Sequence, residues 1–161
     1  MSGFIAVNEP LLNGREEEYL VECIRSGWIS SEGPFVSQFE DAFASRMGRT
    51  YGIAVCNGSV ALDMAVAALD IGAGDEVIMP AHTIISCPAA VVRAGAIPVL
   101  IDCDSATYNM KVSDIEARIT PRTRAIMVVH IFGLPVDMDP LLTLAKAHGL
   151  RIIEDAAEMH G

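Results

Sequence analysis

Two places in the sequence have residue types that could bind a ligand: Asn57-Gly58-Ser59 and Asp155. Each follows an apolar run typical of a buried strand, Tyr51–Val55 for the first and Arg151–Glu154 for the second. A glycine lets an anion approach the backbone, a serine hydroxyl can donate, and a following helix presents free N–H groups. The turn at 57–59 could therefore hold a phosphate, or it could be an ordinary strand-to-helix turn capped by Asn or Ser.

The carboxylate of Asp155 has several possible roles at a strand end: a helix cap, a metal ligand or a charge partner. Pyridoxal phosphate needs one such carboxylate against its ring nitrogen, because a protonated ring acts as an electron sink. Glu154 should point the opposite way if strand geometry continues. Glu158 falls on the same side as Asp155 if a helical turn begins there, and it could then reach the ring hydroxyl.

Alternating strands and helices would position these residues. Five short apolar runs are expected to be strands: 51–55, 76–80, 97–101, 125–129 and 151–154. Helices are predicted between them, over 59–69 and 84–94, from a capping box at 113–116, and from Asp139-Pro140 to near Gly149. This pattern predicts an α/β fold, a mainly parallel sheet with helices on both faces, whose ligands bind beyond the carboxyl ends of the strands.

The first fifty residues predict a helix over 15–25, a glycine-bracketed loop over 27–33 and a second helix from Pro34. Three phenylalanines of the second helix lie on one face and are expected to pack in a core: Phe35, Phe39 and Phe43. With no internal repeat and no low-complexity linker, the sequence marks no domain boundary.

Composition narrows the function classes. The 161 residues carry a net charge of −10 with scattered basic residues, which argues against nucleic acid as a partner. No apolar run approaches the roughly 18 residues of a membrane span, and no signal peptide is visible, so a cytoplasmic protein is expected. Four cysteines lack metal-ligand spacing, fit a reducing compartment and are expected to be mostly buried thiols: Cys23, Cys56, Cys87 and Cys103. No metal site is predicted.

Several motifs in one order carry a resemblance over about Ile5 to Gly161. They are Gly27-Trp28-Ile29-Ser30-Ser31, Asn57-Gly58-Ser59, Gly74-Asp75-Glu76-Val77-Ile78-Met79-Pro80, Val129-His130-Ile131-Phe132-Gly133 and Ile153-Glu154-Asp155-Ala156-Ala157-Glu158. The chain resembles the DegT/DnrJ/EryC1/StrS family of nucleotide-sugar aminotransferases. The resemblance implies the large domain of a type I pyridoxal-phosphate-dependent aminotransferase, a homodimer with its active site at the subunit interface.

The resemblance also assigns cofactor roles. Gly58 and Ser59 would hold the phosphate of pyridoxal 5'-phosphate, Asp155 would pair with the pyridine nitrogen, and Glu158 would lie near the ring hydroxyl. The position after Thr83 commonly carries an aromatic residue that stacks on the ring. Here it is Ile84, whose aliphatic side chain can still cover a ring face.

The substrates implied are glutamate and a keto-sugar linked to a nucleotide. The motifs are most similar to members that aminate C4 of a GDP-linked 4-keto-6-deoxy sugar for surface polysaccharide. Trp28 and Ser30 lie in a loop that tends to approach the sugar. His82 and His130 could each have a functional role or a structural role in the core or in a loop.

The Schiff-base lysine of the family is expected beyond Gly161, because neither Lys111 nor Lys146 falls at its position. Residues 1–161 would then be the N-terminal segment and part of the large domain, inactive alone, with the rest of that domain and a small C-terminal domain further on. Two alternatives remain: a sugar dehydratase of the same family, in which histidine replaces the lysine, and a non-catalytic truncated subunit.

Overall fold

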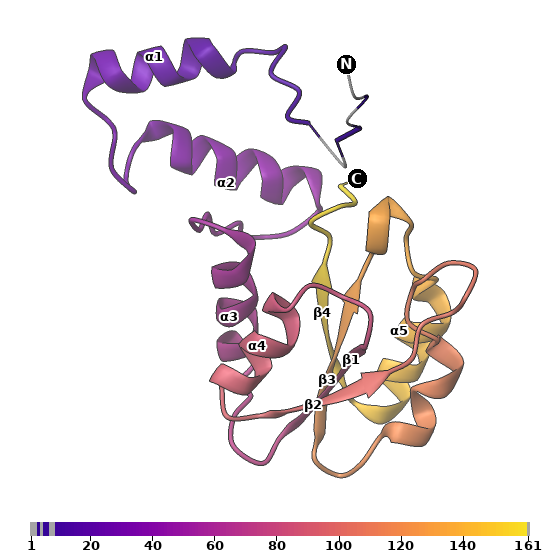
Figure 1. Cartoon of the computed structure of the whole chain (residues 1–161). Helices are drawn as coiled ribbons and strands as arrows, with labels where there is room; N and C mark the ends of the chain where they lie inside the picture. Colours follow the sequence, from indigo (N-terminus) through magenta and orange to yellow (C-terminus); the bar gives the residue numbers. More distant parts are fainter. Residues whose placement is uncertain (1–2, 4, 7–8, 161) are drawn as a thin grey trace. The chain divides into compact units, whose positions relative to one another are not determined.

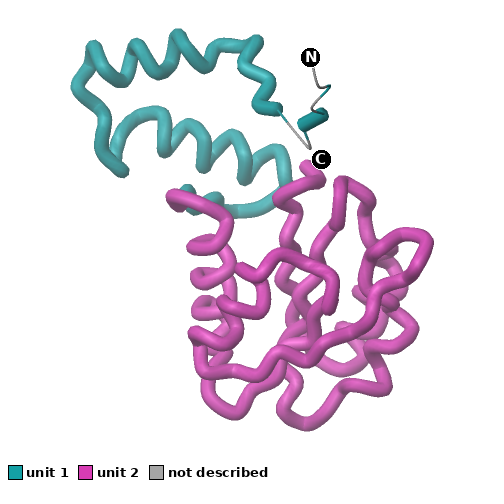
Figure 2. Tube along the Cα trace, viewed as in Figure 1, with its two compact units in different colours: residues 1–54 teal, residues 55–161 magenta. Residues whose placement is uncertain are grey.

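The computed structural model describes residues 3, 5–6 and 9–160. The chain divides into two compact units, one ending at Ala54 and the other beginning at Val55 (Figure 2). The first unit holds two helices and the second holds a sheet with its covering helices (Figure 1).

The first unit confirms both predicted helices, α1 (Glu16–Ser26) and α2 (Pro34–Arg46). Tyr19 of α1 packs on Phe35 of α2 with ring centroids 4.9 Å apart. The expected burial of the aromatic face is wrong for Phe39 and Phe43, which are 56% and 40% exposed although their rings stack on each other. A hollow between α1 and α2 reaches Phe39, so the contact between the helices leaves the rest of the face open.

The run over 51–55 is not a strand, contrary to prediction. No strand in the described residues pairs with it, and its backbone is held by α2 instead. The Ala54 amide donates to the Glu40 carboxylate at 2.7 Å, and a Cβ on Gly52 would lie 2.5 Å from the Glu40 carbonyl oxygen. An apolar run becomes a strand only where a neighbouring strand takes its hydrogen bonds, and here a helix side chain takes one of them.

The second unit confirms the predicted α/β fold. Its sheet has the order β2-β1-β3-β4 and every pairing is parallel. The strands are β1 (Glu76–Pro80), β2 (Ile97–Ile101), β3 (Thr123–Val129) and β4 (Arg151–Asp155), and the helices of this unit are α3 (Gly58–Ala68), α4 (Ser86–Arg93) and α5 (Met138–His148).

Alternate side chains of the central strands enter two separate cores. Met79 and Met127 pack with α3 and α4, whereas Ile78 and Ile126 pack with α5. This alternation follows from the two-residue period of a strand. Helices on both faces explain why β1 is buried along its whole length.

The short connections differ from prediction in detail. Two 3₁₀ turns, η1 (Val112–Asp114) and η2 (Glu116–Arg118), replace the expected capped helix. The Ser113 hydroxyl donates to its neighbour Asp114 at 3.0 Å, so it does not cap the Glu116 amide. A third turn, η3 (Ile131–Gly133), follows β3. Helix α5 begins at Met138, which puts Pro140 at the third position of its first turn, where no amide partner is lost.

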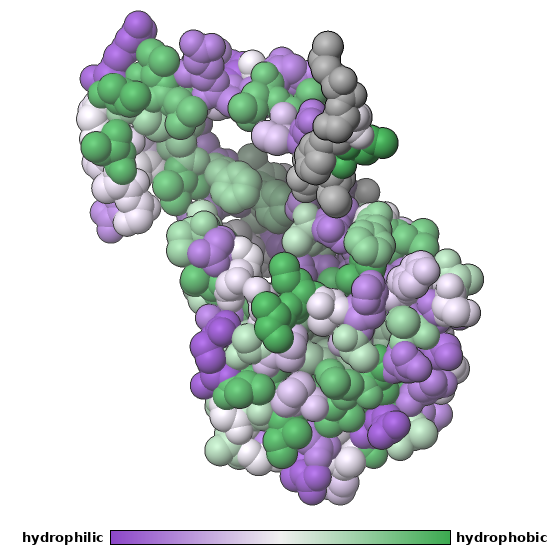
Figure 3. All heavy atoms as spheres, viewed as in Figure 1, coloured by the Kyte–Doolittle hydropathy of each residue, from purple (hydrophilic) through white to green (hydrophobic). Residues whose placement is uncertain are grey.

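Apolar side chains also lie on the surface of both units, visible as green spheres in Figure 3. The largest include Leu11, Ile24, Ile29, Ile84, Ile85 and Phe132. In the part of the chain that the structure describes, no helix is long and apolar enough to cross a membrane.

Candidate active site

A cavity of about 380 Å³ lies where β1, β3 and β4 end. Its volume falls in the range of roughly 300–1,000 Å³ typical of small-molecule sites. The wall comes from the last residues of β3 and β4 and from the loops that follow β1, β3 and β4: His82, Thr83, Ile84, Val129, His130, Ile131, Phe132, Asp155, Ala157 and Glu158. The structure therefore brings three of the predicted cofactor residues, Ile84, Asp155 and Glu158, onto one wall.

Asp155 is the last residue of β4, and both of its carboxylate oxygens accept a hydrogen bond. Oδ1 accepts from the Ala157 amide at 3.1 Å and Oδ2 accepts from the Cys87 thiol at 3.4 Å. The Cys87 sulfur in turn accepts from the Thr83 hydroxyl at 3.3 Å. Burial raises the pKa of the Cys87 thiol to about 11, so the thiol stays protonated and acts as a donor.

Glu154 points away from Asp155, as strand geometry predicts. Its Oε1 accepts from His130 Nε2 at 2.9 Å, while His130 Nδ1 accepts from the Val136 amide at 3.1 Å. Because Nδ1 accepts, the ring proton of this buried histidine lies on Nε2. His130 thus fixes the backbone of the loop after β3, which is the structural one of its two predicted roles.

Glu158, on the cavity wall, contacts the loop after β3. Its Oε2 accepts from the Phe132 amide at 2.7 Å, which leaves the other oxygen free of this bond. Phe132 has a φ of +54°, unusual for an aromatic residue, and Gly133 follows with a φ of +76°. The Phe132 ring is exposed and lines the cavity.

The turn at 57–59 lies beside the cavity wall rather than on it. Asn57 caps α3, because its side chain accepts from the Val60 amide at 3.0 Å. The next two amides, of Gly58 and Ser59, have no carbonyl of a preceding turn to bond, and a Cβ on Gly58 would meet nothing within 4 Å. This open helix start has the chemistry to hold a phosphate.

Ser59 links that turn to the cavity wall. Its hydroxyl lies 2.7 Å from the hydroxyl of Ser86, the first residue of α4. The next residue of α4 is Cys87, which contacts Asp155. The starts of α3 and α4 thus meet at Ser59 and Ser86, next to the residue that contacts Asp155.

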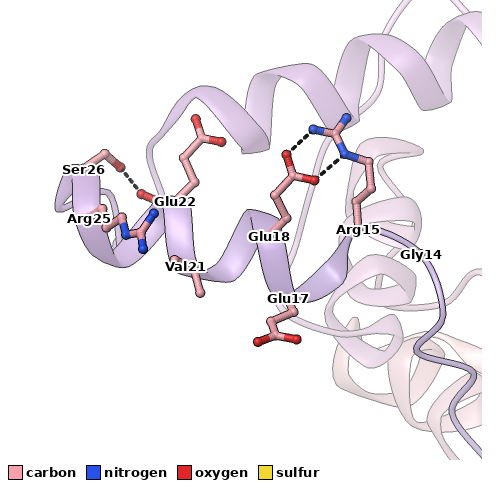
Figure 4. A pocket seen from close by; sticks show the side chains of 8 residues that line it. All are labelled: Gly14, Arg15, Glu17, Glu18, Val21, Glu22, Arg25 and Ser26. Atoms are coloured by element: carbon pink, nitrogen blue, oxygen red, sulfur yellow. Dashed lines mark hydrogen bonds and ion pairs between the residues drawn. The ribbon is translucent and has the colours of Figure 1, made fainter.

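Trp28 and Ser30 lie in the first unit and do not line this cavity. Ser30 donates to the Glu32 carbonyl at 3.1 Å, and Trp28 packs against Gly33 within the same loop. A larger hollow in this unit runs along α1 alone. Its wall is formed by exposed charged side chains such as Arg15 and Glu18, an ion pair at 2.5 Å (Figure 4). It contains none of the predicted site residues.

The structure adds two residues to the predicted site: Phe132, which lines the cavity, and Cys87, which contacts Asp155 but does not line the cavity. Cys87 was expected to be one of several buried thiols, yet it is the one buried cysteine among the four, whereas Cys56 is exposed. Its contact with Asp155 joins residues 68 positions apart. Phe132 could have been found from the glycine after it, since a turn with positive φ often exposes its side chain at a functional site.

The chain is similar in sequence to a family of known aminotransferases. The model of the DegT/DnrJ/EryC1/StrS aminotransferase family matches residues 10–161. The GDP-perosamine synthase of Caulobacter vibrioides is 49% identical over 157 residues, which cover 98% of this chain and 42% of that protein. The chain spans about four tenths of the length of such relatives.

Solved structures agree with this match. An aminotransferase from Psychrobacter cryohalolentis superimposes with a TM-score of 0.88 at 42% identity, over 94% of this chain and 39% of that one. NtdA from Bacillus subtilis, solved with bound cofactor PMP, superimposes with a TM-score of 0.85 at 33% identity, over 90% of this chain and 33% of that one. The predicted fold class is therefore confirmed as part of a pyridoxal-phosphate-dependent aminotransferase fold.

Proposed function

Because the chain belongs to the DegT/DnrJ/EryC1/StrS aminotransferase family, we propose that it supplies part of the active site of a pyridoxal-phosphate-dependent sugar aminotransferase. The observation that carries the proposal is the placement of Asp155. Its carboxylate lies on a cavity wall at the carboxyl end of a parallel sheet, held by two donors and with no cation of the described residues bonded to it.

Asp155 would pair with the pyridine nitrogen and keep it protonated. The bound ring then supplies an electron sink for the carbon that exchanges its amino group. The amides of Gly58 and Ser59 would hold the phosphate, aided by the partial positive charge at the start of α3. Support for this division comes from the Ser59–Ser86 contact, since it links the phosphate turn to the helix that contacts Asp155.

The remaining two cofactor residues would complete the ring site. Ile84, 61% exposed and on the cavity wall, would cover one face of the ring. Glu158 would direct its second carboxylate oxygen toward the ring hydroxyl while the first stays on the Phe132 amide. Both roles use side chains that already converge on one cavity.

The proposed substrates are glutamate and a nucleotide-linked keto-sugar. The similarity to GDP-perosamine synthase favours GDP-4-keto-6-deoxymannose, which would be converted to GDP-perosamine for surface polysaccharide in the cytoplasm. Trp28 and Ser30 would approach the sugar. The Schiff-base lysine is proposed to follow Gly161 in the complete protein, which would act as a homodimer.

The test is an assay of the full-length protein that carries these residues. With pyridoxal phosphate, glutamate and GDP-4-keto-6-deoxymannose, we expect equal amounts of 2-oxoglutarate and a sugar nucleotide of the mass of GDP-perosamine. A product that has lost a hydroxyl instead of gaining an amino group would indicate the dehydratase. Absence of cofactor binding would contradict the proposal and favour a non-catalytic subunit.

A further inference from the structure

We propose that Cys87 is a positioning residue for the cofactor carboxylate, because its thiol donates to Asp155 Oδ2 and holds the carboxylate in the orientation that meets the pyridine nitrogen. This inference rests on the proposed function, since it needs a ring nitrogen at Asp155. It adds a residue outside the predicted cofactor set.

The geometry of the thiol leaves it few alternatives. Cys87 is 0% exposed and lies in the first turn of α4, 3.4 Å from Asp155 Oδ2. The Thr83 hydroxyl donates to its sulfur at 3.3 Å, so a lone pair of the sulfur is already used. With the sulfur engaged as acceptor by Thr83, the S–H bond is free to point at the carboxylate.

The two donors to Asp155 come from different elements. Cys87 approaches from α4, which packs on β1 and β2, and the Ala157 amide approaches from the turn that follows β4. A carboxylate held at both oxygens loses rotation about its terminal torsion, which is otherwise broad. Supporting contacts of this kind set how accurately a site residue is placed.

The protonation state of the thiol agrees with this role. Burial raises the pKa of Cys87 to about 11, so the neutral thiol is present at neutral pH. A thiolate at this position would repel Asp155 instead of donating to it.

The first experiment measures the hydrogen bond without cofactor. The infrared S–H stretching band of Cys87 is isolated as the difference between the wild-type protein and Cys87→Ala. We expect a band at low frequency, as for a thiol bonded to a carboxylate, which moves to higher frequency in Asp155→Ala. A band that does not move would overturn the proposal.

The second experiment measures the dissociation constant for pyridoxal phosphate of the full-length protein by titration of cofactor absorbance. Cys87→Ala and Cys87→Ser are close in size, but only serine keeps a donor. We expect about tenfold weaker binding for alanine and less than about threefold for serine. Thermal unfolding of both variants shows whether packing has changed. Thr83→Val should weaken cofactor binding less than Cys87→Ala does.

The outcomes separate this inference from the proposed function. If Asp155→Asn weakens cofactor binding but Cys87→Ala does not, only the positioning role fails. Equal losses for Cys87→Ser and Cys87→Ala would also overturn it, because packing rather than the donor would then matter. If the wild-type protein binds no cofactor, the proposed function fails first.

Discussion

At the two ends of the parallel sheet, Asp75 and Glu76 have different hydrogen-bond partners from Asp155 and Glu158. At the amino end, Glu76 accepts from Arg122 and from the Thr120 hydroxyl at 2.5 Å, and Asp75 pairs with Arg124 at 2.8 Å. At the carboxyl end, Asp155 and Glu158 accept only from amides and a thiol among the described residues.

This difference in partners indicates a division of roles. Carboxylates neutralised by arginine stabilise the fold, and the Thr120 hydroxyl and Arg122 hold the pKa of Glu76 below its ordinary value despite burial. Carboxylates held in place without a cation keep their negative charge available to a ligand. If the roles divide in this way, substitutions at the amino end should change stability and substitutions at the carboxyl end should change cofactor binding.

The largest effect on stability is expected from Glu76→Ala. The change removes a buried carboxylate and leaves the Thr120 and Thr123 hydroxyls without their partner, so the free energy of unfolding should fall by about 3 kcal/mol. Urea denaturation measures it, with Glu116→Ala as the control at an exposed glutamate. Equal effects for the two variants would show that the amino-end cluster contributes no special stability.

The pH dependence of stability gives a second test of the same cluster. Since the pKa of Glu76 is lowered in the folded state from an ordinary value of 4.5, its contribution is complete above that value and is lost as the pH falls through the lowered pKa. We expect Glu76→Gln to cost about 2 kcal/mol near pH 7 and less below pH 4. Urea denaturation from pH 7 to pH 3 measures the difference, and a constant difference would contradict this interpretation.

Several features of this sheet could be predicted from the sequence, because buried parallel strands have apolar runs that are visible locally. The strands at 76–80 and 97–101 have the predicted bounds. Helix α3 begins and ends one residue before the predicted 59–69. The run at 51–55 has the same local pattern, but no strand among the described residues pairs with it, and pairing depends on parts of the chain far away in the sequence.

In the candidate site, too, local features could be predicted from the sequence but contacts between distant residues could not. The turn at 57–59 and Asp155 are identified by residue types next to apolar runs. The Cys87 contact with Asp155 and the Glu158 contact with the Phe132 amide depend on where α4 and η3 are placed, which no local pattern contains. Sequence therefore identifies candidate ligand-binding groups more readily than the residues that hold those groups in place.

At the carboxyl end, Glu158→Gln should affect binding more than stability. Glutamine can still accept from the Phe132 amide, so the turn at η3 is kept while the charge is lost. We expect cofactor binding to weaken about fivefold and the free energy of unfolding to change by less than about 0.5 kcal/mol. Isothermal titration and denaturation of the same preparation test both parts. A large loss of stability without loss of binding would reverse the interpretation.

The smallest predicted effect is an increase in cofactor affinity. Ile84→Phe places an aromatic ring on the cavity wall and should tighten cofactor binding about threefold, since aromatic pairs add about 0.5–1.5 kcal/mol beyond burial. Ile85→Phe is the matched control, because Ile85 is adjacent and 77% exposed but does not line the cavity. If both variants bind the cofactor more tightly by the same factor, Ile84 does not face the ring.

The most direct test of the central claim is a pyridoxal phosphate titration of the full-length protein with Asp155→Asn. The matched control is Asp102→Asn, an exposed aspartate just after β2 at the same edge of the sheet. We predict that Asp155→Asn weakens binding about 30-fold or more while Asp102→Asn leaves it within about twofold. Equal dissociation constants for the wild-type and Asp155→Asn proteins would contradict the assignment of the carboxyl end as the cofactor site.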